Sequence, residues 1–310
     1  MLYVSDIHKS FGNNHVLRNF NLSIAKGEFY SLLGTNGAGK STSINIIAQL
    51  LKPDSGSIEV AGLKAVSGAN TEIKKLLGVV PQEIALYEEL SAWENMVFWG
   101  KLNRVSKIHI VERGKYILER FGLYERRHEK IKTYSGGMKR RINIAAALLH
   151  DPELILMDEP TVGIDPQSRN NIYEFILELK QKGKTILYTT HYMEEAERFS
   201  DRIGIIDSGH IVATGTFAQI KQNINVPDKI QVSFEGELGP VQAKLAALKS
   251  SGGVAIEGQS VLMDTNDFKN DLKTVVMLFN ECDADIVHIE KKEVNLETIF
   301  LKLTGKNLRD

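Results

Sequence analysis

Short runs of apolar and β-branched residues alternate with helical patterns over the first two thirds of the chain. The runs that predict strands lie at residues 28–33, 154–157, 185–190 and 202–207. Their apolar or β-branched character is nearly continuous, which is typical of parallel strands whose sheet is covered on both faces. We therefore expect an α/β fold with a mostly parallel sheet. Between Gln82 and His150 the pattern is helical, at 93–102, 108–121 and 136–149, and predicts an α-helical insertion over about residues 83–150.

A second module follows a turn-rich stretch with Pro227 near residue 225. We expect one domain over residues 1–225 and a small α+β domain over 226–310. The predicted order is strand 229–234, helix 240–249, strands 254–257 and 260–264, helix 267–281 and strand 285–290, which is the β-α-β-β-α-β order of a ferredoxin-like fold. A last helix is predicted after Asn295 as N-cap, with Val294 and Ile299 as a hydrophobic staple and Gly305 past its end.

The composition of the chain limits the kinds of partner and the cellular compartment that we expect. The chain has 310 residues, 43% hydrophobic and 25% charged, with a formal net charge of −1, so we expect no nucleic-acid partner. Cys282 is the single cysteine, which favours a reducing compartment. Charged residues close to Met1 argue against a signal peptide, and no apolar run has the roughly 18 residues of a spanning helix. We expect a cytoplasmic protein that reaches a membrane only through a partner.

A glycine-rich loop after the first predicted core strand carries the main chemical signal. Residues 34–41 match G-x-x-x-x-G-K-[ST], and a helix is predicted over 41–51. Glycines let backbone N–H groups curl around an anion, and the helix N-terminus faces that anion. We expect Lys40 to bridge the β- and γ-phosphates, Ser41 to ligate Mg²⁺ and Thr42 to bind the α-phosphate. The alternative is a plain glycine-rich turn.

Two further motifs extend this interpretation. The strand at 154–157 ends in Asp158 and Glu159; we expect Asp158 to hold Mg²⁺, through water, and Glu159 to polarise the water that attacks the γ-phosphate. Ser135, Gly136 and Gly137 open a helix, with Ser135 as a natural N-cap, and form a candidate second anion site. Taken alone, the first pair is also typical of solvated cap residues and the second of an ordinary capped helix.

These motifs, in this order, resemble the nucleotide-binding subunit of an ATP-binding cassette (ABC) transporter. The set comprises Gly34 to Thr42, Gln82, Ser135-Gly136-Gly137, Asp158-Glu159, Gly163-Ile164-Asp165 and Thr190-His191. The resemblance implies a P-loop NTPase fold with an ABC-type nucleotide-binding domain and ATP hydrolysis with Mg²⁺. The residues implied to hold ATP are Phe11, Gly34, Thr35, Asn36, Gly37, Ala38, Gly39, Lys40, Ser41, Thr42, Ser135, Gly136, Gly137 and Asp165.

The resemblance also assigns individual roles. Phe11 stacks on adenine, Gln82 contacts Mg²⁺ and the attacking water, and His191 contacts the γ-phosphate beside the catalytic Glu159. Asp165 lies in the loop that crosses to a second subunit. In the family the 135–137 motif acts in trans, which implies a homodimer with two composite sites. Each lone side chain has an ordinary alternative: a core phenylalanine, an exposed amide, a satisfied histidine and a turn residue.

Departures from the common family pattern indicate which subgroup of the family the chain resembles. Tyr134 and Met138 flank the 135–137 motif where many relatives carry leucine and glutamine, and residues 160–166 and 296–301 are similar to those of daunorubicin-resistance exporter subunits. This resemblance implies an exporter ATPase on the cytoplasmic face of the membrane, with a separate permease that carries a drug, lipid or polysaccharide. Two alternatives stay open: a non-transport ABC ATPase that acts on DNA or ribosomes, and a module that clamps ATP without turnover. The sequence does not name the transported substrate.

Overall fold

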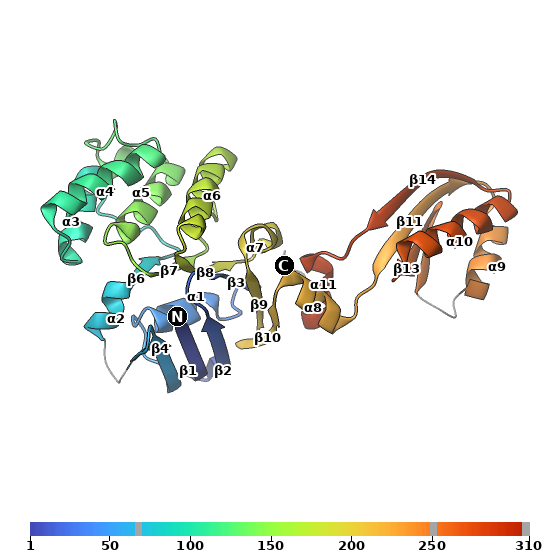
Figure 1. Cartoon of the computed structure of the whole chain (residues 1–310), viewed down its shortest axis with the longest axis horizontal. Helices are drawn as coiled ribbons and strands as arrows, with labels where there is room; N and C mark the ends of the chain where they lie inside the picture. Colours follow the sequence, from blue (N-terminus) through green and yellow to red (C-terminus); the bar gives the residue numbers. More distant parts are fainter. Residues whose placement is uncertain (66–69, 249–252, 306–310) are drawn as a thin grey trace. The chain divides into compact units, whose positions relative to one another are not determined.

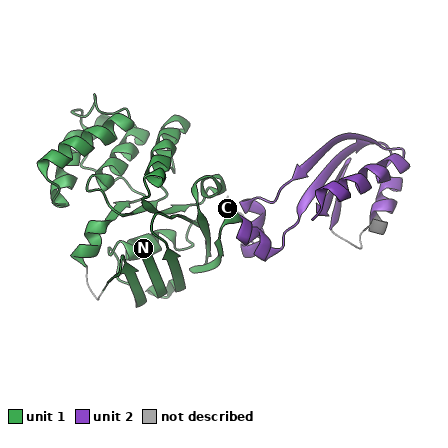
Figure 2. Cartoon of the chain, in the orientation of Figure 1, with its two compact units in different colours: residues 1–217, 306–310 green, residues 218–305 purple. Residues whose placement is uncertain are grey.

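The computed structural model describes residues 1–65, 70–248 and 253–305 (Figure 1). The chain forms two compact units, Met1–Phe217 and Ala218–Gly305 (Figure 2). The division therefore falls after the first residue of helix α8 (Phe217–Ile224), whereas the sequence analysis places it after residue 225. Within the described residues, no helix is both long enough and apolar enough to cross a lipid bilayer.

A six-stranded sheet forms the centre of the first unit. Its order is β10-β9-β3-β8-β7-β6, and all neighbours are parallel except the edge strand β10. Its strands are β3 (Phe29–Leu33), β6 (Leu77–Val80), β7 (Leu154–Asp158), β8 (Thr185–Thr190), β9 (Arg202–Asp207) and β10 (His210–Gly215). Every residue of β3, β7 and β8 is buried. The expected parallel sheet is confirmed, and alternate residues of these strands belong to separate cores on its two faces.

A second, antiparallel sheet was not predicted. Its order is β2-β1-β4-β5, with β1 (Leu2–Phe11), β2 (Asn14–Ile24), β4 (Ser55–Val60) and β5 (Leu63–Lys64). Residues such as Val4, Leu22 and Ile58 share a core with Ile44 and Ile47 of helix α1. This packing anchors the helix that follows the glycine-rich loop.

Helix α1 (Lys40–Ile47) is shorter than expected from the apolar run that continues to Leu51. Gln49 takes a left-handed φ of 58°, and the N–H groups of Leu50 and Leu51 both turn back to the carbonyl of Asn45. This tight turn ends the helix, because L-residues leave the right-handed helix when they adopt positive φ. The side chain of Leu50 is exposed, so the apolar run at this point is not a core face.

Helices α3, α4 and α5 form the expected insertion and gather on one side of the sheet (Figure 1). The helices of the first unit are α1, α2 (Thr71–Leu76), α3 (Ala92–Leu102), α4 (Lys107–Arg120), the 3-10 turn η1 (Ile131–Thr133), α5 (Gly136–Leu148), α6 (Pro166–Gln181) and α7 (Met193–Phe199). Ser91 begins α3 with a complete capping box to Glu94, and Ser135 caps α5 as predicted. The core of this insertion continues into the face of the sheet that carries Phe29 and Tyr188.

The second unit has the predicted β-α-β-β-α-β order. Its elements are α8, β11 (Asp228–Glu235), α9 (Leu238–Leu248), β12 (Val254–Glu257), β13 (Ser260–Thr265), α10 (Phe268–Glu281), β14 (Asp285–Lys292) and α11 (Leu296–Thr304). The sheet order β12-β13-β11-β14, antiparallel throughout, is compatible with a ferredoxin-like fold. Asn295 caps α11 and Gly305 ends it at positive φ, as expected. Residue 249, the predicted end of the first helix, lies outside the described residues.

Candidate functional site

The glycine-rich loop joins the end of β3 to the start of α1. Gly39 occupies the N-cap position of α1 with a φ of 110°, and no side chain caps the helix. At Gly34, a Cβ atom would lie 2.5 Å from the carbonyl oxygen of Ile206, so the close approach of β9 admits only glycine there. The sequence after the strand thus folds into a tight loop with an uncapped helix N-terminus, which is a general anion-binding arrangement.

Lys40 links this loop to the end of strand β7. Its side chain is only 4% exposed, and Nζ donates hydrogen bonds to the carbonyls of Gly34 (2.7 Å) and Thr35 (2.9 Å). The same nitrogen lies 3.0 Å from Oε1 of Glu159, which is also buried. A buried carboxylate needs a partner charge or several donors. Lys40 therefore places a cation between the loop and the carboxylate pair, where we expected phosphate oxygens and the attacking water to meet.

Glu159 is held in an unusual backbone conformation. Its φ is 44°, in the left-handed region, which costs a non-glycine residue on the order of 1 kcal/mol. The Glu159 N–H points to the carbonyl oxygen (3.2 Å) and to Oγ1 (3.1 Å) of Thr189, and Oε2 of its side chain lies 3.1 Å from Nδ1 of His191. The structure thus brings Glu159 and His191 together, from strands β7 and β8.

Thr189 was not singled out by the sequence analysis. It pairs in register with Asp158 across the β7–β8 ladder, and its Oγ1 donates a 2.6 Å hydrogen bond to the Asp158 carboxylate. One hydroxyl therefore contacts both members of the acidic pair. The only sequence signal is its position directly before Thr190-His191; the partner strand becomes visible only in the sheet.

Arg140 is a second residue that the sequence analysis did not assign. Its guanidinium is buried at 2% exposure in α5 and donates to the carbonyl of Pro81 (2.6 Å) and to that of Glu159 (3.0 Å). Burial lowers the pKa of Arg140 from its usual value. Arg140 shares a helix face with Ile144, four residues further along α5. This spacing is the sequence pattern that could have indicated an inward-facing arginine. Through Arg140, the segment before Gln82 is tied to the backbone of Glu159.

Other predicted residues lie outside this hydrogen-bonded cluster of the single chain. The Phe11 ring is 51% exposed, with Nζ of Lys9 lying 5.4 Å from its centroid. Gln82 and Ser135 are exposed, and the Ser135 hydroxyl accepts from the N–H of Met138. The remaining loop residues lie where the motif places them: Thr35, Ser41 and Thr42 are half-buried, Asn36 and Gly37 are exposed, and Ala38 is buried.

The 135–137 motif packs against the Asp165 loop of its own chain. Asp165 caps helix α6 by accepting from the N–H of Ser168 (2.9 Å), and this bond lowers the pKa of Asp165. A Cβ atom at Gly137 would lie 2.2 Å from Oγ of Ser168 and 2.9 Å from Oδ2 of Asp165. Gly137 therefore lets these two segments approach closely, whereas the neighbouring Gly136 is exposed with open space around it.

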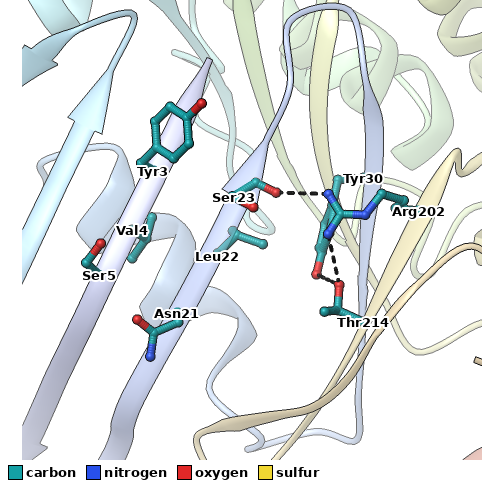
Figure 3. A pocket seen from close by; sticks show the side chains of 9 residues that line it. All are labelled: Tyr3, Val4, Ser5, Asn21, Leu22, Ser23, Tyr30, Arg202 and Thr214. Atoms are coloured by element: carbon teal, nitrogen blue, oxygen red, sulfur yellow. Dashed lines mark hydrogen bonds between the residues drawn. The ribbon is translucent and has the colours of Figure 1, made fainter. Parts of the chain in front are cut away.

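A separate pocket of about 300 Å³ opens between strands β1, β2 and β9–β10 (Figure 3). Arg202 within it donates to the carbonyl of Ser23 (3.3 Å) and to Glu28 (3.1 Å), and the Tyr30 hydroxyl lies 2.9 Å from Thr214 Oγ1. None of the residues expected to hold nucleotide lines this pocket. It is therefore distinct from the cluster around Lys40.

Comparison with known proteins places the whole chain in one family. The family model for "ABC transporter" matches residues 17–162. The linearmycin resistance ATP-binding protein LnrL of Bacillus subtilis (strain 168) is 43% identical over 100% of both chains. The daunorubicin/doxorubicin resistance ATP-binding protein DrrA of Streptomyces peucetius is 38% identical, over 97% of this chain and 91% of DrrA.

A solved structure supports the same assignment. The dimeric structure of a post-hydrolysis state of the ATP-binding cassette MJ0796, bound to ADP and Pi, superposes with a TM-score of 0.63 and 31% identity. It covers 70% of this chain and 98% of that one. The same family assignment is consistent with the glycine-rich loop, with the buried Lys40–Glu159 pair and with the full-length relatives. The chain belongs to the ABC transporter family and is an ATP-binding, ATP-hydrolysing cassette with relatives of the daunorubicin-resistance type.

Proposed function

We propose that this ATPase drives export of a small molecule or lipid-like compound through a separate permease, as a homodimer with two shared ATP sites. The carrying observation is the cluster in which Lys40, Glu159 and His191 meet beside the glycine-rich loop. It supplies a cation that can bind phosphate, a carboxylate that can bind the attacking water, and a histidine beside that carboxylate. The "resistance" in the printed names of the relatives supports export, because removal of a toxic compound is a direct route to resistance.

The geometry suggests how hydrolysis proceeds. Residues 34–42 hold the phosphates, with Lys40 bridging the β- and γ-phosphates. Water attacks the γ-phosphorus, the bond to the bridging oxygen breaks, and ADP and phosphate form. Glu159 orients the water and accepts its proton, and His191 donates from Nδ1 to the Glu159 carboxylate and contacts the γ-phosphate. Hydrogen bonds to Thr189, Arg140 and Val162 on the Glu159 backbone fix this carboxylate in place before ATP arrives.

Magnesium fits the available donors. Among the described residues, no group of three or more His, Cys, Asp or Glu side chains could hold a metal ion by itself. Mg²⁺ in nucleotide sites commonly keeps several waters and binds one or two protein oxygens plus phosphates. Ser41 and Asp158 supply such oxygens, and Gln82 is the proposed third contact. When bound, the ion neutralises charge on the phosphates.

A second copy of the chain completes each site in this proposal. Ser135 and Gly136 begin a helix with exposed positions and no acidic residue in its first turn. A helix N-terminus of this kind favours an anion. We propose that it meets the γ-phosphate held by the other copy, with Asp165 at the same interface. The dimeric state of the MJ0796 structure supports the pairing of two copies.

The permease contact is proposed on the segment after Gln82. Ile84, Tyr87 and Phe98 expose apolar surface, and the rings of Tyr87 and Phe98 lie 4.8 Å apart, edge to face. The buried Asn95 fixes this segment, since its Oδ1 accepts from the N–H of Tyr87 and its Nδ2 donates to the Tyr87 carbonyl. A rigid apolar patch next to Gln82 is suited to a helical loop of a membrane partner.

The central test replaces Glu159 by glutamine. Glu159→Gln should bind ATP but lose nearly all hydrolysis, and ATP should then shift the chain to a stable dimer in size-exclusion chromatography. Glu153→Gln, an exposed change just before the same strand, is the matched control and should behave like the wild type. Rapid turnover by Glu159→Gln would remove Glu159 from its proposed role.

The transport assignment is tested separately. Affinity purification of the chain from detergent-solubilised membranes should recover a polytopic membrane protein, and Tyr87→Ala should weaken that recovery without reducing ATP binding. Recovery of ribosomes or DNA in place of a membrane protein would favour the alternative class of non-transport ABC ATPases. An absence of any ATP hydrolysis with the permease present would favour an ATP-clamping module.

A further inference from the structure

Glu195 of helix α7 is a buried carboxylate with no part in the proposed mechanism. Its side chain is only 3% exposed. Four hydroxyl groups surround it: Oε1 accepts from Thr161 Oγ1 (2.5 Å) and Tyr173 OH (2.6 Å), and Oε2 accepts from Thr190 Oγ1 (2.5 Å) and Tyr188 OH (3.0 Å). Among the described residues, these hydroxyls are its partners and no cation is paired with it.

This environment makes the carboxylate a rigid junction. An ionised carboxylate only accepts hydrogen bonds and has about four lone-pair sites, and all of them are used here. Because no cation offsets the buried charge, the four O–H donors must do so, and the loss of any one leaves charge unsatisfied. Burial and the bond to Glu195 raise the pKa of Tyr173, so this hydroxyl remains a donor at neutral pH.

The two oxygens of Glu195 serve two different segments. On the Oε2 side, Thr190 directly precedes His191, and its hydroxyl also accepts from the N–H of Tyr192 at 2.9 Å. Thr190 therefore fixes the chain on both sides of His191. On the Oε1 side, Thr161 is fully buried and begins the turn that leads to Asp165.

Tyr173 lies on helix α6, which that turn enters with Asp165 as its N-cap. Thr161 and Tyr173, whose hydroxyls bind Oε1, therefore lie at the two ends of one segment, residues 161–173, which we call the Asp165 segment. A single carboxylate joins this segment to the segment of His191.

We propose that Glu195 is a positioning residue that couples His191 to the Asp165 segment. A displacement of His191 toward the γ-phosphate moves Thr190, and the Glu195 carboxylate passes that displacement to Thr161 and Tyr173. The inference rests on the proposed function in one respect: Asp165 faces the second copy of the chain. Under that arrangement, Glu195 connects the state of one ATP site to the loop that borders the other.

The test uses Glu195→Gln, with Glu194→Gln as the matched control. Glutamine keeps the shape but replaces one acceptor oxygen by an NH₂ donor, so it cannot accept from all four hydroxyls. Glu194 is exposed on the same helix. Steady-state hydrolysis by Glu195→Gln should show kcat reduced by about tenfold with KM for ATP within about twofold, since misplacement of positioned groups affects the chemical step.

Hydrogen exchange separates coupling from a local structural role. In full-length Glu195→Gln, amides in both 159–168 and 188–193 should exchange faster than in the wild type, and neither should change in Glu194→Gln. Faster exchange in 188–193 alone, or an unchanged kcat, would overturn the proposal. A wild-type chain that neither hydrolyses ATP nor dimerises would instead overturn the proposed function.

A pair of threonine variants keeps the inference testable if Glu195→Gln fails to fold. Thr161→Val and Thr190→Val each remove one hydroxyl at nearly constant volume and leave the carboxylate in place. Coupling through Glu195 predicts that the double variant loses less kcat than the product of the two single losses, because the connection is already broken by the first change. Multiplicative losses would show two independent contacts and would contradict the proposal.

Discussion

Replacement of Arg140 tests whether the backbone of the proposed catalytic glutamate is held in place from helix α5. Arg140→Met keeps most of the apolar volume but removes both hydrogen bonds, to Pro81 and to Glu159. The Glu159 backbone, at a φ of 44°, then keeps its two contacts to Thr189 and a longer hydrogen bond (3.3 Å) from the Val162 N–H to its carbonyl. The left-handed conformation is unfavourable for glutamate, so we expect the released peptide to relax and carry the carboxylate away from the attacking water.

The magnitude follows from the two bonds that are lost. A hydrogen bond from a charged donor contributes about 1.5 to 3 kcal/mol, so the pair is worth about 3 to 6 kcal/mol before costs. Among the described residues, no carboxylate forms an ion pair with the buried Arg140, and burial lowers the pKa of its guanidinium; methionine avoids this desolvation cost. We expect a net loss of about 2 kcal/mol, or a decrease in Tm of roughly 4 to 8 °C for a unit of this size.

Activity should fall more than stability explains. We expect kcat for ATP hydrolysis to drop about tenfold at a temperature where the variant is folded, with KM within about twofold, because the glycine-rich loop and Lys40 are unchanged. Phosphate release measures kcat, and calorimetry measures Tm. Arg113→Met is the control, since Arg113 also donates to two backbone carbonyls, those of Leu148 and Leu149 at the other end of α5. A lower Tm with wild-type kcat in Arg140→Met would refute the positioning role.

The remaining predictions concern the phosphate loop and a surface cluster. Lys40→Ala should lower ATP affinity at least about tenfold in calorimetric titration, and unchanged affinity would contradict the role assigned to the glycine-rich loop. The same change leaves His191 as the ion-pair partner of the buried Glu159 among the described residues, so it should destabilise the first unit by about 3 kcal/mol. Partial burial acts to raise the pKa of Glu178, but hydrogen bonds from Lys182, Tyr116 and Arg120 outweigh it and lower this pKa to about 2. Glu178 therefore stabilises the fold above about pH 4.5, and we expect its contribution, about 1 kcal/mol, to disappear as the pH falls from 4.5 toward 2. Unfolding of Glu178→Gln and wild type should converge over that range, whereas a constant difference would show that ionisation is not the cause.

The sequence by itself determined the elements that depend on local order. The glycine spacing of residues 34–41, the mostly apolar core strands and the N-caps Ser135 and Asn295 all occur as predicted. These features follow from neighbouring residues: φ angles that only glycine tolerates easily, side chains that satisfy nearby N–H groups, and runs too apolar to lie at a surface. The family resemblance rests on the same local motifs, which is why one sequence was sufficient to state it.

Local pattern failed where a distant partner decides the outcome. The antiparallel sheet was missed because β1 pairs with β2 and β4 through long-range contacts, and α1 was overextended because Leu50 and Leu51 continue its apolar run. Nothing in the neighbouring residues indicates the left-handed turn at Gln49.

Only the tertiary structure decided how the chemical groups are held. Thr189 reaches Asp158 and Glu159 because two strands align in register, and Arg140 reaches Glu159 because α5 packs on the sheet. Glu195 gathers hydroxyls from β8, from α6 and from the turn after β7. Most of these contacts join residues far apart in sequence, so no local pattern encodes the arrangement. The sequence names the residues proposed to meet ATP, whereas packing sets the backbone and the hydrogen bonds that position them.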